Sequence, residues 1–196
     1  DRYIANQSPK AYVDEANERD ISIFELLNEK VKDQMPGESG LIVLDWHNGN
    51  RSVLSDSNLK GCVFGMSLQT THEELYRAYL EATAFGTKMI MQQYQSWNMD
   101  IEDVFACGGI PKKNPLMMDI YANVLNKKVT IIDSEYAPAI GAAILGSVCG
   151  GAHQTLNEAI KSMKEPVLYE VTPDPEKVKR YKKLFSAYKA VSYTHL

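Results

Sequence analysis

The chain has 196 residues, of which 44% are apolar, and a formal net charge of −4. This length suits one domain with short appendages, and the acidic balance provides no basic surface of the kind that nucleic-acid binders use. The three cysteines, Cys62, Cys107 and Cys149, are odd in number and lack CxxC spacing, which argues against a disulfide framework and a zinc site. We therefore expect a reducing, cytoplasmic setting.

Three segments are expected along the chain. They are a helical segment over residues 1–39, the main domain over residues 40–190, and a non-native or disordered tail over residues 191–196, where the sequence follows no helical pattern. No apolar run approaches the roughly 20 residues of a membrane helix, and no signal peptide is recognised. Because the chain starts at Asp1 and not at Met, we expect it to be a piece of a longer protein.

A capping box begins the first predicted helix. The Ser22 hydroxyl can accept from a backbone N–H while Glu25 reaches back, which predicts a helix to about residue 34. The short apolar runs at residues 41–44 and 61–65 then predict two strands. The sequence between them is polar, with Gly and Asn, and predicts a loop.

A second capping box, at Thr71 and Glu74, begins the longest predicted helix, which runs to about residue 97. Its apolar residues recur every three or four positions and predict one buried stripe. A strand over residues 103–107 follows, and it ends in a pair of glycines. Pro115, at a first helical position, predicts the next helix.

The last third of the chain continues the alternation of strands and helices. Residues 128–132 predict a strand, and residues 139–149 predict a helix built of small residues. A third capping box lies at Thr155, and a terminal amphipathic helix begins near Asp174. This alternation predicts an α/β fold.

The glycine pair Gly108-Gly109 is the first candidate site. Without Cβ atoms the backbone can turn sharply and let a ligand approach closely, and ligands of α/β sheets bind at the carboxyl ends of strands. A plain turn is the alternative interpretation. The sequence contains no GxxxxGK[ST] P-loop and no dinucleotide fingerprint.

Two further segments have both a structural and a functional interpretation. The Ala- and Gly-rich helix at residues 139–149 either packs closely on a neighbour or lies beside the glycine pair and closes one side of a nucleotide cleft. In the loop at residues 45–52, Arg51 either pairs with a phosphate or a carboxylate of a ligand or forms a structural ion pair.

The remaining polar residues do not predict a catalytic centre. Asp119, Asp133 and Glu135 are possible acids, but their spacing marks no catalytic pair. The four histidines are scattered, so the sequence supports neither a metal cluster nor a Ser/His/Asp triad.

Several short segments occur in the order and spacing of a known family. The segments are Gly65-Met66-Ser67, Tyr76-Arg77-Ala78, Glu81-Ala82-Thr83-Ala84-Phe85, Cys107-Gly108-Gly109 and Ala139-Ile140-Gly141-Ala142-Ala143. Together they resemble the C-terminal domain of the FGGY carbohydrate kinases, over about residues 40–151. The resemblance implies an actin-like, ribonuclease-H-like ATPase fold that forms one of two halves around an ATP cleft.

Within the family, residues 44–52, 108–115 and 118–122 resemble the L-ribulokinase branch. This resemblance implies ATP-dependent phosphorylation of L-ribulose in L-arabinose breakdown, with Mg2+ on the phosphates of ATP. Two alternatives stay open at this point. One is another FGGY kinase, acting on xylulose or glycerol, and the other is a non-catalytic actin-like module that binds a nucleotide.

The resemblance also implies roles for four residues. By position, Gly108 and Gly109 would face the adenosine and phosphate path, and Lys113 and Asn114 would lie near the adenine. Many relatives have Asn where this chain has Lys113. Because the sugar pocket and the catalytic aspartate of the family lie mainly in its N-terminal half, no catalytic residue and no metal ligand is predicted here.

The same resemblance implies the partners of the chain. They are ATP, a sugar such as L-ribulose, and the missing N-terminal domain, while a homo-oligomer stays open. We expect the segment alone to be inactive, because phosphoryl transfer needs groups from both sides of a closed cleft.

Overall fold

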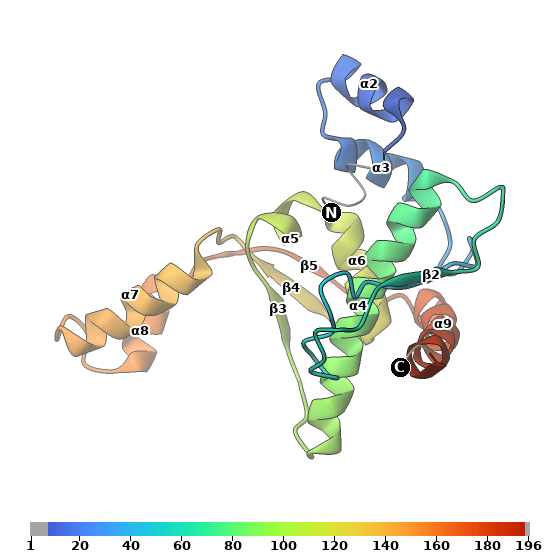
Figure 1. Cartoon of the computed structure of the whole chain (residues 1–196). Helices are drawn as coiled ribbons and strands as arrows, with labels where there is room; N and C mark the ends of the chain where they lie inside the picture. The colour runs from blue at the N-terminus through green and yellow to red at the C-terminus, as the bar shows by residue number, and fades with distance from the viewer. Residues whose placement is uncertain (1–7, 195–196) are drawn as a thin grey trace.

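The computed structural model describes residues 8–194 of the chain. Helices and strands alternate through most of this range, as Figure 1 shows. In chain order they are α2 (Lys10–Glu18), α3 (Ile23–Val31), β1 (Ile42–Leu44), β2 (Cys62–Phe64), α4 (His72–Ser96), β3 (Val104–Ala106), α5 (Gly109–Lys113), α6 (Pro115–Leu125), β4 (Val129–Ile132), α7 (Ala137–Cys149), α8 (Leu156–Met163), β5 (Val167–Val171) and α9 (Pro175–Thr194).

The strands of the described residues form two small sheets. β1 and β2 pair antiparallel, with Val43 opposite Val63. The other sheet has the order β3-β4-β5, in which β3 and β4 are parallel and β5 is antiparallel to β4. Parallel strands need a crossover connection, and α5 and α6 supply it here. The expected α/β class is confirmed, whereas β5 and the short helix α5 were not predicted from the sequence.

Local capping explains where helices α3 and α4 begin. The Ser22 hydroxyl accepts from the Glu25 N–H at 3.2 Å, and the Glu25 carboxylate accepts from the Ser22 N–H at 2.8 Å. Thr71 and Glu74 form the same reciprocal pair at the start of α4. These bonds satisfy donors that a helix start otherwise leaves unpaired. Both predicted starts are therefore confirmed.

The main core lies where α4 meets α6, α9 and β1. Phe85 of α4 is surrounded by three aromatic rings of α9, with centroid distances of 6.2 Å to Tyr181, 5.7 Å to Phe185 and 5.2 Å to Tyr188. All four side chains are buried. The apolar stripe predicted for α4 is thus the seam of the core.

A buried charge pair joins α4 to two neighbouring helices. Arg77 Nε lies 3.1 Å from Glu81 Oε1, and Arg77 Nη1 donates to the carbonyl of Val31 in α3 at 2.9 Å. The Tyr181 hydroxyl of α9 donates to Glu81 at 3.0 Å. Burial raises the pKa of the Glu81 carboxyl, and the positive charge of Arg77 opposes that rise. The network fixes α3 and α9 against α4.

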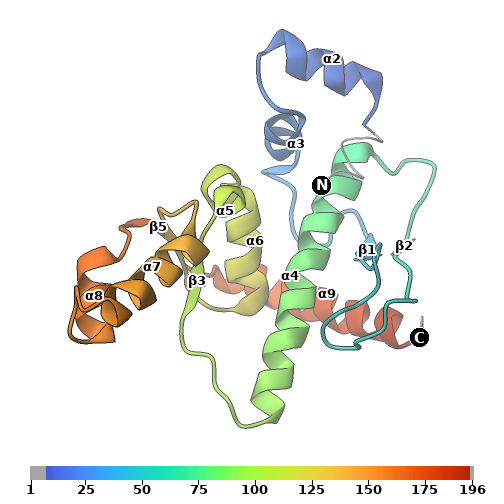
Figure 2. The ribbon, with the colours of Figure 1, turned by 60° about the vertical axis from the view of Figure 1, so that its left-hand side comes forward.

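Helices α7 and α8 pack on each other and extend away from the remaining helices, as Figures 1 and 2 show from two sides. No residue of α7 is buried. A Cβ added at Gly141 or Gly146 would meet no atom within 4 Å. Contrary to one interpretation of the sequence, the small residues of α7 do not mediate close packing in this structure.

Helix α9 continues through Thr194, beyond the predicted end of the domain at residue 190. The expectation that residues 191–194 leave the helical pattern is therefore wrong. Ser192 is buried and Val191 packs on the main core, so tertiary contacts extend a helix that is already nucleated. Residues 195 and 196 of the expected tail lie outside the described residues.

Three further features of the described residues concern disulfides, metal sites and membrane helices. Cys62, Cys107 and Cys149 are free thiols. Between residues 8 and 194, no group of three or more His, Cys, Asp and Glu side chains is arranged to hold a metal ion. In the same range, no helix combines the length and the apolar character that crossing a membrane requires.

Candidate functional site

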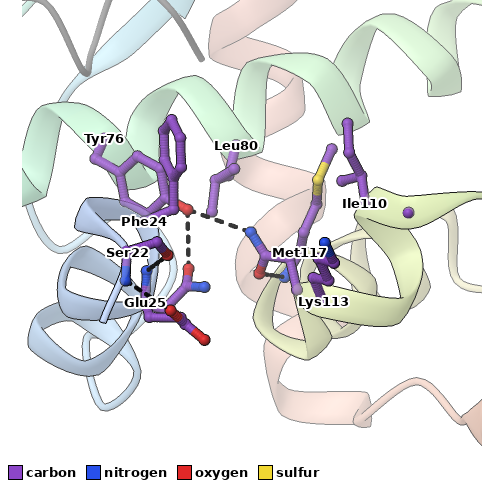
Figure 3. A pocket seen from close by; sticks show the side chains of 11 residues that line it. Ser22, Phe24, Glu25, Tyr76, Leu80, Ile110, Lys113 and Met117 are labelled. Atoms are coloured by element: carbon purple, nitrogen blue, oxygen red, sulfur yellow. Dashed lines mark hydrogen bonds between the residues drawn. The ribbon is translucent and has the colours of Figure 1, made fainter. Parts of the chain in front are cut away.

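A cavity of about 690 Å3 lies between α3, α4 and the segment formed by α5 and α6. Figure 3 shows that side chains from these elements face one another across it. Its lining residues are Ser22, Phe24, Glu25, Asn28, Tyr76, Leu80, Gly109, Ile110, Lys113, Asn114 and Met117.

The glycine pair forms the entrance to α5. Gly108 precedes this helix with φ 97°, a conformation that favours glycine over any residue with a Cβ. Its N–H donates to the carbonyl of Ser134 at 2.7 Å, which joins the end of β3 to the loop after β4. Gly109 lines the cavity, and a Cβ added there would meet no atom within 4 Å. A ligand can therefore approach the backbone at Gly109.

Asn114 holds the start of α6 at the floor of the cavity. Its Oδ1 accepts from the Met117 N–H at 2.9 Å, and its Nδ2 donates to the Tyr76 hydroxyl at 3.2 Å. The Tyr76 hydroxyl in turn donates to Asn28 Oδ1 of α3 at 2.9 Å. A chain of hydrogen bonds thus runs from α6 through α4 to α3.

The two walls of the cavity carry opposite charges. Glu25 lies on α3 and Lys113 on α5. The pKa of the Glu25 carboxyl is lowered mainly by its bond from the Ser22 backbone N–H, and the positive charge of Lys113 contributes to the same shift. Phe24 adds an aromatic surface to the α3 wall, with its ring centroid 6.4 Å from that of Tyr76. The cavity therefore combines a flat apolar surface with polar groups at its edges.

The structure brings three of the four predicted ligand residues together. Gly109, Lys113 and Asn114 line the cavity, and Gly108 shapes its edge through the backbone. The α3 wall was missed, because the sequence of α3 signalled only a helix start. The spacing of Phe24 and Asn28, four residues apart on one helix face, was the available signal for a shared surface.

One other expectation about the cleft differs from the structure. No residue of α7 lines the cavity, so α7 does not close its side; α3 supplies that wall. Arg51 is exposed in the loop between β1 and β2 and does not line the cavity.

The acidic residues considered as catalytic candidates form surface ion pairs. Asp119 lies 2.8 Å from Lys177. Lys112 lies 2.6 Å from Asp133 and 3.7 Å from Glu135, and the bond to Asp133 is the main reason why the pKa of Lys112 is raised.

Comparison with known proteins identifies the family. Residues 3–149 match the model described as FGGY family of carbohydrate kinases, C-terminal domain. This chain belongs to the FGGY family of carbohydrate kinases. The resemblance expected from the motif order is therefore confirmed.

Ribulokinases are close relatives of this FGGY chain. Those of Staphylococcus aureus strains Newman and USA300 are each 72% identical over 193 residues, which covers 98% of this chain and 35% of the relative. The expected likeness to the ribulokinase branch is confirmed. The chain spans about a third of the length of these curated relatives.

Solved FGGY kinases share the fold. The chain resembles a xylulose kinase from Rhodospirillum rubrum with a TM-score of 0.78 at 23% identity, covering 98% of this chain and 36% of that one. A ligand-bound xylulose kinase from Lactobacillus acidophilus gives a TM-score of 0.76 at 20% identity, with coverages of 94% and 38%. A Plasmodium falciparum glycerol kinase with ADP gives 0.63 at 22% identity, with coverages of 88% and 36%. These likenesses confirm the actin-like α/β fold.

Proposed function

We propose that this chain is the C-terminal part of an ATP-dependent ribulokinase and that its cavity takes the adenosine part of ATP. The observation that carries the proposal is that Gly109, Lys113 and Asn114, which the motif order assigns to the nucleotide, line one cavity. Its volume of about 690 Å3 lies in the range of small-molecule sites. The 72% identity to ribulokinases supports L-ribulose as the sugar, and the ADP complex of the glycerol kinase supports a nucleotide.

This segment would supply one wall of the active site. Phosphoryl transfer requires a base for the sugar hydroxyl and a nucleotide held in line with it, inside a closed cleft. The described residues hold the nucleoside side of this arrangement through Gly109 and the α3 wall. We place the base and the sugar pocket in the N-terminal part of the longer protein. Mg2+, which would neutralise charge on the ATP phosphates, has no assigned ligand among residues 8–194.

The proposal extends to the biological setting. A ribulokinase acts in L-arabinose catabolism, and the identity to the Staphylococcus aureus enzymes supports that role. The three free thiols support a reducing cytoplasm as its location.

The nucleotide site is tested by Gly109→Val in the full-length protein. The added side chain would enter the space in front of the backbone, where no protein atom lies within 4 Å of the Cβ position. We expect the KM for ATP to rise about tenfold or more. Gly141→Val is the matched control, because it has equally open surroundings on α7 outside the cavity. An unchanged KM for ATP in a folded Gly109→Val protein would contradict the proposed site.

The sugar is tested separately with a panel of L-ribulose, D-xylulose and glycerol. We expect the highest kcat/KM with L-ribulose when ATP is saturating. Turnover of D-xylulose or glycerol in the absence of L-ribulose turnover would refute the substrate while leaving the nucleotide site intact.

A further inference from the structure

The orientation of the Asn28 side chain follows from a helix cap on the other side of the cavity. The Met117 N–H is only a donor, so the Asn114 oxygen must face it, at 2.9 Å. The Asn114 amide nitrogen then faces the Tyr76 hydroxyl, at 3.2 Å, and uses that oxygen as an acceptor. The single hydroxyl hydrogen of Tyr76 is left to donate to Asn28 Oδ1, at 2.9 Å.

This chain of bonds favours one orientation of the Asn28 amide over the flipped one. If the amide were flipped, its NH2 group would face the Tyr76 hydroxyl, and the Tyr76 O–H would lose the acceptor that Asn28 Oδ1 provides. Asn114 cannot replace that acceptor, because it presents its own NH2 group to the same hydroxyl. Asn28 therefore presents its oxygen and its nitrogen to the cavity in a fixed order. Figure 3 shows the hydrogen bonds that meet at Tyr76.

We propose that Asn28 is the residue that selects adenine over guanine in this cavity, and that Tyr76 positions it. This inference rests on the proposed function, because it assumes that the base of a nucleotide enters the cavity. An amide can accept from the adenine amino group with its oxygen and donate to the neighbouring ring nitrogen with its NH2 group. The second lone pair of Asn28 Oδ1 is available for this, since Tyr76 needs only one.

Guanine does not match the fixed amide. It carries a carbonyl oxygen where adenine carries the amino group, so two acceptors would oppose each other at Asn28. Turning the amide would remove this repulsion, but the bond from Tyr76 opposes the turn. Lys113 cannot replace Asn28 in this role, because an ammonium group only donates hydrogen bonds and cannot accept from the adenine amino group.

Phe24 has a different task on the same wall. It lines the cavity four residues before Asn28, and its ring lies beside that of Tyr76. An aromatic ring stacks on any base, because every base has a π-face. We infer that Phe24 contributes affinity for the base and Asn28 contributes the choice between bases.

The test measures kcat/KM for ATP and for GTP in the full-length protein with saturating L-ribulose. Asn28→Leu is expected to lower the ATP/GTP ratio, which is kcat/KM for ATP divided by kcat/KM for GTP, about tenfold or more. The change should come mainly from a higher KM for ATP, with little change in kcat. Tyr76→Phe removes the orienting hydroxyl and is expected to lower the same ratio, with a smaller effect on ATP itself. Phe24→Leu, the matched control, is expected to raise both KM values and leave the ratio unchanged.

The outcomes separate this inference from the function on which it rests. An unchanged ATP/GTP ratio in folded Asn28→Leu and Tyr76→Phe proteins would overturn the selective role of Asn28, provided that Gly109→Val still raises KM for ATP. If Gly109→Val also has no effect, the nucleotide site itself is elsewhere. If Asn28→Leu does not fold, the ratio in Tyr76→Phe decides alone, because that change keeps the buried ring.

Discussion

Helices α4 and α7 are both rich in small and apolar residues, but only α4 is part of a core. Phe85 of α4 touches three aromatic rings of α9, whereas no residue of α7 is buried and Leu145 is 59% exposed. The difference shows that an apolar helix sequence does not by itself specify burial, because burial needs a partner surface. α4 has its partners within this chain, while α8 is the main neighbour of α7 among residues 8–194.

The largest effect on the free energy of unfolding is expected from Phe85→Ala in the core helix α4. Removing a fully enclosed ring leaves a cavity among Tyr181, Phe185 and Tyr188, and we expect a loss of about 4 kcal/mol in the free energy of unfolding. Urea unfolding of the wild type and the variant measures this loss. Phe85→Leu should lose less, because it refills part of the cavity. A loss below about 1 kcal/mol for Phe85→Ala would mean that the α4–α9 seam is not the main core.

The next largest effect is expected from Arg77→Met. We expect a loss of about 3 kcal/mol in the free energy of unfolding at neutral pH, because Glu81 stays buried without its cation. The loss should depend on pH. A buried carboxyl without a counterion has a raised pKa in the folded state. The stability that the variant loses relative to the wild type should therefore become smaller as the pH falls toward about 4.3, the pKa of a glutamate in the unfolded chain.

Unfolding curves at pH 5 and pH 8 test the direction of this dependence. The double variant Arg77→Met/Glu81→Leu is the control, and it should recover much of the loss because no charge remains buried. A loss for Arg77→Met that is larger at pH 5 than at pH 8 would contradict an uncompensated Glu81.

A smaller effect on the free energy of unfolding is expected from removing one helix cap in the core, at α4, and one in the α7–α8 pair, at α8. The Thr71 side chain accepts from the Glu74 N–H at 3.3 Å in α4, and the Thr155 side chain accepts from the Glu158 N–H at 3.2 Å in α8. Thr71→Ala should lower global stability by about 1 kcal/mol. Thr155→Ala should change it less, because α8 can open separately from the core. Urea unfolding measures the first effect and amide hydrogen exchange in α8 the second. Equal global losses would show that the two regions unfold as one unit.

The smallest effect is expected from Leu145→Ser on the exposed face of α7. In this chain the change in unfolding free energy should stay within about 0.5 kcal/mol, as for other surface substitutions. The same substitution in the full-length protein is the informative comparison. A clearly larger loss there would show that the longer chain covers α7, and a large loss in the chain described here would show that α7 already has a packed partner.

Much of the secondary structure was predictable because its signals are local. The capping boxes at Ser22 and Thr71 each act within one helical turn, and both occur in the structure as predicted. Helix α5 was missed, since the glycines at its start predicted a turn and not a helix. β5 was missed because a strand of five residues is stabilised mainly by its pairing with β4, which the sequence does not display.

Part of the candidate site was predictable and part was not. The order of the motifs led to Gly109, Lys113 and Asn114, which lie close together along the chain. Nothing in the sequence connected them to Asn28, which reaches the same cavity through a hydrogen bond to Tyr76, 48 residues away. The fate of residues 191–194 was also unpredictable, because they are helical through contacts with the core and lack a helical pattern of their own.

The sequence by itself determined most helix starts, most strands and the membership of the FGGY family, since hydrogen bonds within one turn and the order of motifs are written along the chain. The tertiary structure alone decided which helix forms the second wall of the cavity, how the Asn28 amide is oriented, and that α4 is buried while α7 is not. These properties depend on contacts between segments that are distant in the chain, and such contacts are set by packing and not by local pattern.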